Sequence, residues 1–374
     1  QLQDALVRLH ATFTVTSGNQ FARVSIAAEK DSLLTVLKLV FDVLRHPRFP
    51  PDGVPRIRAA HVAAIEAGRR DLATMMAQAA RDHVNAARGA RRGEPGYIPS
   101  VDEQLAEYRD TTLDDVRQVY ERYWSANRAD VAVVGAIPEG VAEVVEQGLG
   151  DWKKPEAPAY EPFEPHYADL GDARFDVQAD DKSSASLRMW HGLALNQADA
   201  DYPPLLLAVH ILGGGGLESR LNTRVRRGLG LSYGAGARLN ADLRGNDGGV
   251  AIEASFAPQN RDKVMAAIDA ELQAFARDGP TQAELARAKH DMLERLQQAR
   301  ASDAELAGTL DMFAALDRDW AWLAQREAAL EHVTLAQLAE AWRRRMKGQR
   351  FMVTIGGDFK AAGLGTPPEP APTR

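Results

Sequence analysis

The sequence contains no cysteine among its 374 residues. Disulfide bonds, a thiolate nucleophile and cysteine-ligated metals are therefore excluded. Aromatic residues are sparse, at 7%, and no apolar run approaches the roughly 20 residues that a membrane-spanning helix needs. Positive charge is not in excess, because the net charge is −7. This balance argues against a nucleic-acid partner or an anionic membrane surface.

What is present is an ordinary globular composition, with 45% hydrophobic and 26% charged residues. A chain of this length exceeds the size at which one core usually keeps growing, so we expect two domains. The chain begins at Gln1 without a methionine or a signal segment. We therefore expect a fragment or a processed product, and its compartment stays open between cytoplasm and periplasm.

The first part of the chain reads as a mixture of strands and helices. Residues 11–28 alternate apolar and polar on both sides of Ser17-Gly18-Asn19, which predicts a β-hairpin. An amphipathic helix follows Asp31 and ends before Pro47. A long helical tract is predicted from about Pro55 to Ala90.

Two further elements and a linker complete this part. A helix is predicted after Thr112, and residues 129–137 (ADVAVVGAI) are typical of a buried strand. Residues 151–167 carry four prolines and no periodicity, which indicates an interdomain linker.

The second part repeats the order of elements. Strands at FDVQ and ASLRMWHGLAL precede the apolar helix PPLLLAVHIL, and a hairpin turns at residues 244–249. A helix over 262–277, a helical tract from Thr281 past Met312, the helix TLAQLAEAWRRRM and the strand FMVTIGGDF follow.

The repeat has a constant interval of 222 residues. It relates three positions of the first part to three of the second (334 − 112, 342 − 120 and 357 − 135): Thr112, Tyr120 and Gly135 correspond to Thr334, Trp342 and Gly357. A unit recurring at this distance indicates two copies of one module rather than a solenoid. The first copy lacks the counterpart of residues 172–230.

We therefore predict an α+β fold with two homologous modules, each a mostly antiparallel sheet with helices on one face. The expected domains are a module truncated at its N-terminus (1–150), a Pro-rich linker (151–170), a complete module (171–360) and a flexible tail (361–374).

The chain is organised around residues 211–240, ILGGGGLESRLNTRVRRGLGLSYGAGARLN. Glycine clusters permit φ > 0 and close backbone approach, so Gly213, Gly214, Gly215 and Gly216 predict a tight turn. A helix is predicted over LESRLNTRVRR, with Leu217, Leu221 and Val225 as its buried stripe.

The basic and aromatic residues of this stretch have ordinary structural explanations. Arg226 and its neighbours lie in a last helical turn, where cations suit the helix dipole and a glycine caps the end. Tyr233 could equally be an ordinary strand aromatic.

The segment 211–240 as a whole resembles the Arg/Tyr element of the insulinase/pitrilysin family of zinc metallopeptidases. The shared features are LGGG, SRL, an arginine at 226 and GLSYG with a tyrosine seven residues later (233 − 226 = 7). The resemblance implies paired modules that close around a peptide like a clamshell. It also implies that Arg226 and Tyr233 hold the substrate backbone and stabilise the tetrahedral intermediate, a role that a guanidinium and a phenol can perform as preorganised donors.

Two features would serve substrate binding in such an enzyme. Gly213 to Gly216 would let the backbone approach substrate or a neighbouring module. An exposed strand edge near Tyr233, or near residues 250–256, could add an unfolded peptide as an extra strand.

The family's inverted zinc motif, His-x-x-Glu-His, is absent, since no two of the nine histidines lie four residues apart. His290 and Glu294 share a helix face but fit a solvated pair better than a metal site. His61 and Glu66 diverge around a helix, although Glu66 lies roughly where the family keeps its third ligand. The resemblance thus implies zinc in the full-length protein, bound outside this chain.

Other chemistry is excluded by pattern. The glycines at 228, 230 and 234 have the wrong spacing for a dinucleotide loop, and Gly213 to Gly216 lack the Gly-Lys-Ser/Thr of a phosphate loop. Ser219 has no Gly-x-Ser-x-Gly context. The run Arg343-Arg344-Arg345 reads as a helix end facing solvent.

Two functions remain open. The first is the metal-free C-terminal part of a zinc endopeptidase, acting with a zinc-bearing module in cis or in a partner chain. The second is a catalytically inactive peptide-binding or scaffold subunit of the same family. Exposed apolar surface on the truncated module also makes a homodimer an expectation.

We predict that this chain alone holds no stoichiometric zinc, because it has no pair of histidines at ligand spacing on a helix. Elemental analysis of the purified chain after dialysis measures the metal. One tightly bound equivalent would contradict the prediction.

Overall fold

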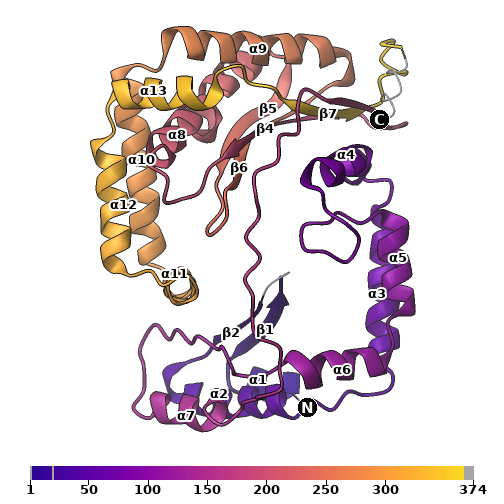
Figure 1. Ribbon diagram of the computed structural model, residues 1–374, viewed down its shortest axis with the longest axis vertical. Coiled ribbons are helices and arrows are strands. Elements are labelled where there is room, and N and C mark those ends of the chain that lie inside the picture. The colour runs from indigo at the N-terminus through magenta and orange to yellow at the C-terminus, as the bar shows by residue number, and fades with distance from the viewer. Residues whose placement is uncertain (1, 19–20, 366–374) are drawn as a thin grey trace. The chain divides into compact units, whose positions relative to one another are not determined.

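The computed structural model describes residues 2–18 and 21–365. The chain divides into two compact units. Unit 1 comprises residues 1–63, 105–163 and 299–318, and unit 2 comprises residues 64–104, 164–298 and 319–374. Strands and helices are mixed in both, as the α+β prediction requires (Figure 1).

Unit 1 is built on a two-stranded antiparallel hairpin. The strands β1 (Thr12–Ser17) and β2 (Ala22–Ala27) pair with Phe13 opposite Ile26. One face packs on α1 (Leu2–Arg8) and α2 (Lys30–Arg45), and α7 (Val141–Leu149) packs on α2. The hairpin prediction is thus confirmed, although Asn19 of its turn lies outside the described residues.

The predicted strand at residues 129–137 is wrong, because this segment has no ladder partner among the described residues and bends at residues 135 and 136. Val133 packs on the core beneath α2 and α7, whereas Val131 and Ile137 are exposed. A β pattern needs a neighbouring strand to satisfy its backbone groups, and unit 1 supplies none here.

Unit 2 holds a five-stranded sheet of order β3-β7-β4-β6-β5. Its strands are β3 (Arg174–Gln178), β4 (Ala185–Ala194), β5 (Ser232–Asn240), β6 (Asp247–Phe256) and β7 (Met352–Gly357). Only the β3–β7 pair is parallel, so the mostly antiparallel character is confirmed. Every residue of β7 is buried, as expected for a strand with neighbours on both sides.

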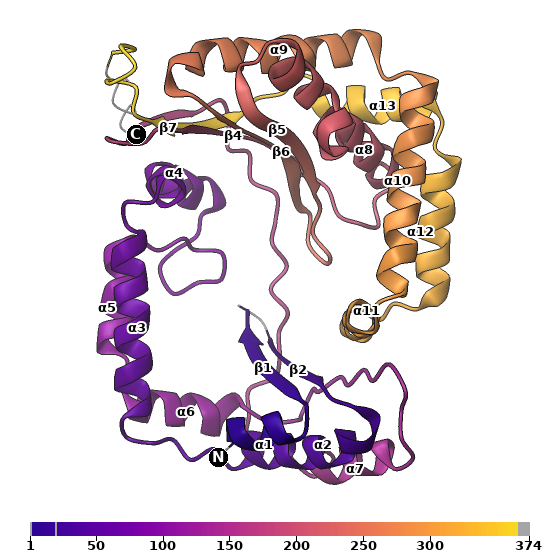
Figure 2. The same ribbon diagram turned by 180° about the vertical axis from the view of Figure 1, so that it is seen from behind.

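The main core lies between this sheet and three helices, namely α8 (Tyr202–Val209), α9 (Arg261–Asp278) and α13 (Leu335–Met346). Both ribbon views show these helices on one side of the sheet (Figures 1 and 2). Phe275 of α9 packs against Trp342 of α13, with ring centroids 4.7 Å apart and the ring planes tilted by 58°. The other face of the sheet receives α4 (Leu72–Arg88), through Ala80 and Val84.

The long helical tracts are each broken once. The first divides into α3 (Gly53–Gly68) and α4, and the second into α10 (Gln282–Arg300) and α11 (Asp303–Ala315). Ser302 caps the N-terminus of α11, which explains the second break. The remaining helices are α5 (Val101–Asp110), α6 (Leu113–Tyr123) and α12 (Trp320–His332), and α12 runs alongside α10 in both views (Figures 1 and 2).

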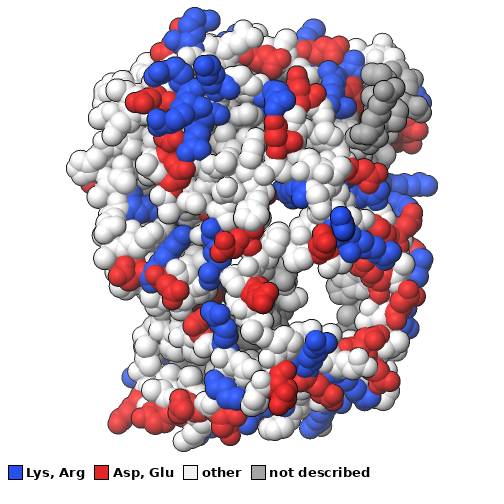
Figure 3. All heavy atoms as spheres, in the orientation of Figure 1, with Lys and Arg blue, Asp and Glu red and all other residues white. Residues whose placement is uncertain are grey.

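The basic end of α13 does not simply face solvent. Lys and Arg side chains gather over this region (Figure 3). Arg344 and Arg345 both bind the buried carboxylate of Asp201, at 2.5 and 2.6 Å, and Arg345 also binds Asp199. These ion pairs tie α13 to the turn before α8, so the solvated-end interpretation is wrong for two of the three arginines.

The repeat is visible in matching helix caps. Thr112 and Thr334 both form capping boxes, with Asp115 and Gln337 respectively. The latter two residues also differ by 222 (337 − 115). A reciprocal cap of this kind satisfies two backbone donors that the first helical turn leaves open.

The compact units do not follow the boundaries read from the repeat, because residues 64–104 pack with unit 2. The domain boundaries at residues 150, 170 and 360 rest on the repeat in the sequence, and they stay a proposal. Within the predicted linker, Leu170 is buried against α4 and β3, and residues 366–374 of the predicted tail lie outside the described residues.

We expect Thr112→Ala and Thr334→Ala each to lower the free energy of unfolding by about 1 kcal/mol, because each removes a capping hydroxyl. Urea denaturation followed by circular dichroism measures the loss. Thr→Ser at the same positions is the control, since it keeps the hydroxyl. Unchanged midpoints in both alanine variants would contradict the role of the caps.

Candidate functional site

The glycine turn begins in a π-helix. The apolar helix α8 passes into η1 (His210–Gly214), which is π-helical, and the short 3-10 helix η2 (Gly216–Glu218) follows. A π-helix widens the turn by one residue and is frequent at functional sites. The tight turn predicted from the glycines is therefore wrong for Gly213 and Gly214, which lie in the π-helix, and the chain bends only at Gly215.

The four glycines have different environments. A Cβ on Gly213 would lie 2.1 Å from the backbone nitrogen of Ala237 in β5, so only glycine fits there. Gly214 and Gly215 lie against the ring of His210, and Gly216 has a φ of +63° on the exposed side. Close packing on β5 thus explains Gly213, while Gly216 is the one most open to solvent.

The arginine-rich segment forms a second π-helix, η3 (Asn222–Gly228). Leu221 and Val225 are fully buried, as predicted. The prediction for Leu217 is wrong, because it lies in η2 before the helix begins and is exposed. The predicted glycine cap directly after the arginines is wrong, because Gly228 is the last residue of the helix and Leu229 is its C-cap. The next glycine, Gly230, adopts a φ of +62°, and its N–H binds the carbonyl of Arg226.

Three of the four arginines between residues 220 and 227 are held by carboxylates. Arg220 binds Glu284 through two hydrogen bonds of 2.7 and 2.8 Å, which lowers the pKa of Glu284 to about 2. Arg224 contacts the buried carboxylate of Glu271, and Arg227 contacts Glu218. The first two pairs and Glu218 line a polar pocket of about 490 Å³ between η3, α9 and α10. Each arginine at this pocket has a carboxylate beside it. The charged residues there are therefore explained by ion pairs that join neighbouring elements of the fold.

Arg226 differs from these neighbours. Its side chain is exposed and has no hydrogen bond or ion pair within the described part of the chain. The backbone turns back at once, because the N–H groups of Leu229, Gly230 and Leu231 bind the carbonyls of residues 224–226. This return brings the chain directly into β5, so Arg226 and Tyr233 stand on adjoining elements.

Tyr233 occupies a β-bulge at the start of β5. Ser232 pairs with Phe256 and Gly234 with Ser255, so Tyr233 is the extra residue of its strand. Its side chain is 58% exposed and has no polar partner among the described residues. Bulges re-aim side chains and recur beside active sites. An ordinary strand aromatic at this position would instead pack on a cross-strand neighbour.

The free strand edge near the site belongs to β5. β5 is the edge strand, whereas β6 lies between β4 and β5, so the alternative edge at residues 250–256 is wrong. Part of the β5 edge is already used, since the N–H of Ala235 donates to the side chain of Asn222 at 3.2 Å.

Asn222 connects all three parts of the site and was missed in the sequence. It is buried, and its amide donates to the carbonyl of Gly216 while accepting from Ala235. It therefore links the glycine turn, the arginine helix and the tyrosine strand. The available signal was a polar residue placed beside the buried stripe of Leu221 and Val225.

His210 is a second buried polar residue that sequence reasoning passed over. Its Nε2 lies 3.4 Å from a carboxylate oxygen of Asp291. Burial lowers the pKa of the imidazole, and the neighbouring carboxylate only partly opposes this. A neutral His210 that supports Gly214 and Gly215 accounts for its position.

The described residues contain no group of three His, Asp or Glu side chains that could hold a metal ion. His290 and Glu294 are 3.6 Å apart on α10, and both are exposed. His61 stacks on Tyr108 instead of approaching a carboxylate, with ring centroids 4.8 Å apart. The donor set of a zinc site is thus not assembled here. None of the described helices has the length and apolar character to cross a membrane.

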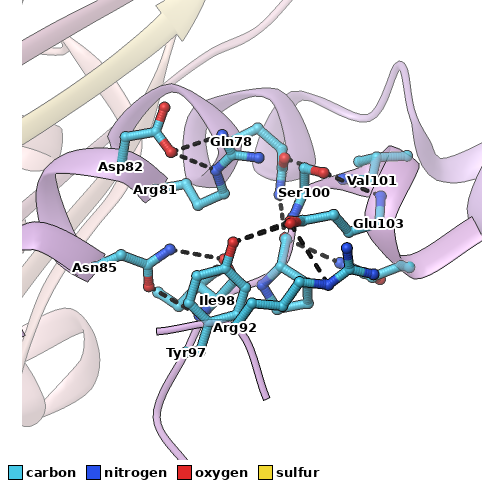
Figure 4. Close-up of polar contacts among 12 residues, drawn as sticks. Gln78, Arg81, Asp82, Asn85, Arg92, Tyr97, Ile98, Ser100, Val101 and Glu103 are labelled. Carbon is cyan, nitrogen blue, oxygen red and sulfur yellow. Dashed lines mark hydrogen bonds and ion pairs between the residues drawn. The ribbon is translucent and has the colours of Figure 1, made fainter. Parts of the chain in front are cut away.

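A second polar cluster lies after α4 (Figure 4). Asn85 exchanges two hydrogen bonds with the backbone of Ile98, and Glu103 accepts from Tyr97 and from the N–H of Ser100. These hydrogen bonds, led by that of Ser100, lower the pKa of Glu103. The cluster closes a loop and caps α5, and each labelled group has a structural partner.

Comparison with known proteins identifies one family. Residues 110–292 match the model of the Peptidase M16 inactive domain. No curated protein gives a significant match to the chain.

Solved structures share the fold at low identity. A Peptidase M16 inactive domain from Pseudomonas fluorescens is 22% identical, with a TM-score of 0.77 over 95% of this chain and 82% of that one. A protease from Helicobacter pylori is 16% identical, with a TM-score of 0.78 over 95% and 84%. The periplasmic protease PqqL from Escherichia coli is 15% identical, with a TM-score of 0.71, and the match covers 95% of this chain but 38% of PqqL.

We expect Gly213→Ala to lower the free energy of unfolding by about 1–3 kcal/mol, because the new methyl group meets the β5 backbone, which cannot move without disturbing the sheet. Urea denaturation measures the change. Gly234→Ala is the matched control in β5, since a Cβ there meets nothing within 4 Å. Equal stability of the two variants would show that Gly213 is not required for packing.

Proposed function

This chain is an insulinase-like member of the M16 family that lacks the inverted zinc motif, and we propose that it supplies the substrate-holding arginine and tyrosine of a zinc endopeptidase. Arg226 and Tyr233 are the proposed catalytic pair. The observation that carries the proposal is their shared exposure on adjoining elements, in a stretch where the other arginines are neutralised by carboxylates.

The proposed chemistry uses both groups as hydrogen-bond donors. Attack of water on a peptide carbonyl moves negative charge onto the carbonyl oxygen. A phenol O–H and a guanidinium aimed at that oxygen stabilise the charge as it develops, and neither needs an altered pKa. An arginine already paired with a carboxylate would serve this role poorly, which favours Arg226 over Arg224 and Arg227.

The proposed substrate is an unfolded peptide bound along the edge of β5. Main-chain hydrogen bonds to an edge strand give affinity without much dependence on sequence. The N–H of Ala235 is occupied by Asn222, and Gly213 lies against the backbone of Ala237, so the peptide would pair outside residues 235–237. Gly216, exposed at the mouth of the turn, is the glycine best placed to lie beside the peptide.

The metal belongs to another polypeptide segment in this proposal. The described residues do not offer a zinc ligand set, so no step is assigned to zinc on this chain. The match covers 38% of PqqL, a relation that supports a longer protein or a partner chain that carries the zinc-bearing part.

A catalytically inactive peptide-binding or scaffold subunit is the second candidate. The matched model is that of an inactive domain, and the absence of the zinc motif favours this role equally. The free β5 edge would then bind peptides without cleavage.

The test is zinc-dependent cleavage of a quenched fluorogenic peptide by this chain mixed with a zinc-bearing M16 partner domain. We expect activity only in the mixture. Tyr233→Phe should then lower kcat by about 10²–10³-fold with little change in KM, because the lost donor acts mainly in the transition state.

Arg227→Ala is the matched control, since Arg227 lies on the same helix but pairs with Glu218. A Tyr233→Phe variant with wild-type kcat would remove Tyr233 from the reaction. Peptide binding without cleavage in every mixture would favour the scaffold.

A further inference from the structure

One face of the unit 2 sheet is only partly covered by helices. The odd-numbered residues of β4 and β5 and the even-numbered residues of β6 supply the main core on the other face. Because side chains alternate along a strand, Arg188 of β4, Glu253 of β6 and Arg238 of β5 lie on the face opposite this core. On that face α4 packs on β3 and β7. The three charged side chains stay 57%, 40% and 67% exposed.

These three residues form one hydrogen-bonded cluster across three neighbouring strands. The register places Arg188 directly opposite Glu253 on one side and Gly236 opposite it on the other. Because Gly236 has no side chain, the guanidinium of Arg238, two residues further along β5, can reach the same carboxylate. Arg188 Nε and Arg238 Nη2 both donate to Glu253 Oε1, at 3.1 and 3.0 Å. The strand register and these hydrogen bonds show that the cluster is continuous.

The cluster has one positive charge in excess. Two guanidiniums share one carboxylate, and both of them contact the same oxygen atom. A guanidinium carries five N–H donors and binds a carboxylate most strongly through two parallel hydrogen bonds to its two oxygens. Neither arginine has this arrangement with Glu253. Donors of Arg188 and Arg238 therefore remain for a second carboxylate.

Arg238 lies on the same edge strand as Tyr233, five residues further along (238 − 233 = 5). At roughly 3.4 Å per residue, the two are separated by roughly 17 Å of strand. Between them this face of β5 carries only Gly234 and Gly236, and a Cβ on Gly234 would meet nothing within 4 Å. No side chain of β5 therefore stands on this face between the tyrosine and the cluster.

A peptide at the β5 edge would place a side chain beside Arg238. The N–H of Ala235 points away from β6, since it donates to Asn222. The alternation along a strand turns the N–H of Leu239 outward as well, beyond the part of the edge that Asn222 and Gly213 occupy. A peptide strand paired at Leu239 has a residue next to Arg238, and such cross-strand neighbours on one face lie about 4.5–5.5 Å apart.

We propose that Arg188 and Arg238 form a carboxylate subsite that gives the chain a preference for acidic peptides. The group recognised is the side chain of an aspartate or glutamate, about five residues from the peptide bond held at Tyr233. Its carboxylate takes the guanidinium donors that Glu253 leaves open. The inference rests on the proposed function, because it assumes a peptide bound along the edge of β5.

The first test is binding of fluorescently labelled peptides to the full chain, read by anisotropy without a zinc-bearing partner. Two otherwise uncharged peptides differ only in one glutamate or one glutamine, and both ends are blocked so that no terminal carboxylate competes. We expect the glutamate peptide to bind about threefold to fivefold more tightly, as an exposed charge pair allows. Equal affinities would overturn the subsite and leave the peptidase proposal intact, whereas binding of neither peptide would overturn both.

A matched pair of variants locates the contact. Arg238→Gln should make the two affinities equal, while Arg277→Gln, which removes a similarly exposed arginine on α9, should preserve the difference. Arg238→Glu should reverse the preference in favour of a peptide with arginine at the same position. A preference for glutamate that survives Arg238→Gln would overturn the proposal.

Cleavage gives the position of the subsite. In the mixture with the zinc-bearing partner domain, the cut should fall about five residues from the glutamate and should move with it when the glutamate is shifted along the peptide. A cut that ignores the glutamate would overturn the proposal. Preferential binding without cleavage would support the subsite and count against the peptidase proposal alone.

Discussion

The site depends on the contact between Gly213 and the backbone of β5. Because no side chain stands between them, the π-helical end of α8 lies directly on the edge strand, and the following turn is fixed in place. Asn222 then bonds the turn at Gly216 and the strand at Ala235. One close approach and one buried amide thereby set the relation between the arginine helix and the tyrosine strand, while leaving Arg226 and Tyr233 themselves exposed.

The distribution of ion pairs explains why one arginine stands apart. Arg220, Arg224 and Arg227 each hold η3 or the residues before it to a carboxylate, and two of those carboxylates lie on α9 and α10. They act as anchors of a short π-helix that has little intrinsic stability. Arg226 makes no such contact in the described structure, so its charge is available to a ligand without breaking the fold.

Much of the fold could be predicted from the sequence, because periodicity and caps are local. The hairpin of unit 1, the helices after Thr112 and Thr334 and the strands of unit 2 follow from these signals. The strand at residues 129–137 failed because strand formation needs a neighbour, which composition cannot reveal. The π-helical geometry, the bulge at Tyr233 and the role of Asn222 were also invisible, since each arises from contacts between segments rather than within one.

The sheet of unit 2 also has a consequence for how the chain is assembled. β7 lies between β3 and β4 in space, yet Arg174 of β3 pairs with Val353 of β7, 179 residues further along (353 − 174). During synthesis β3 therefore has no strand to pair with until β7 has emerged. The hairpin β5–β6 and its neighbour β4 can form earlier, so the last step of folding joins the two ends of the module and carries its largest loop-closure entropy.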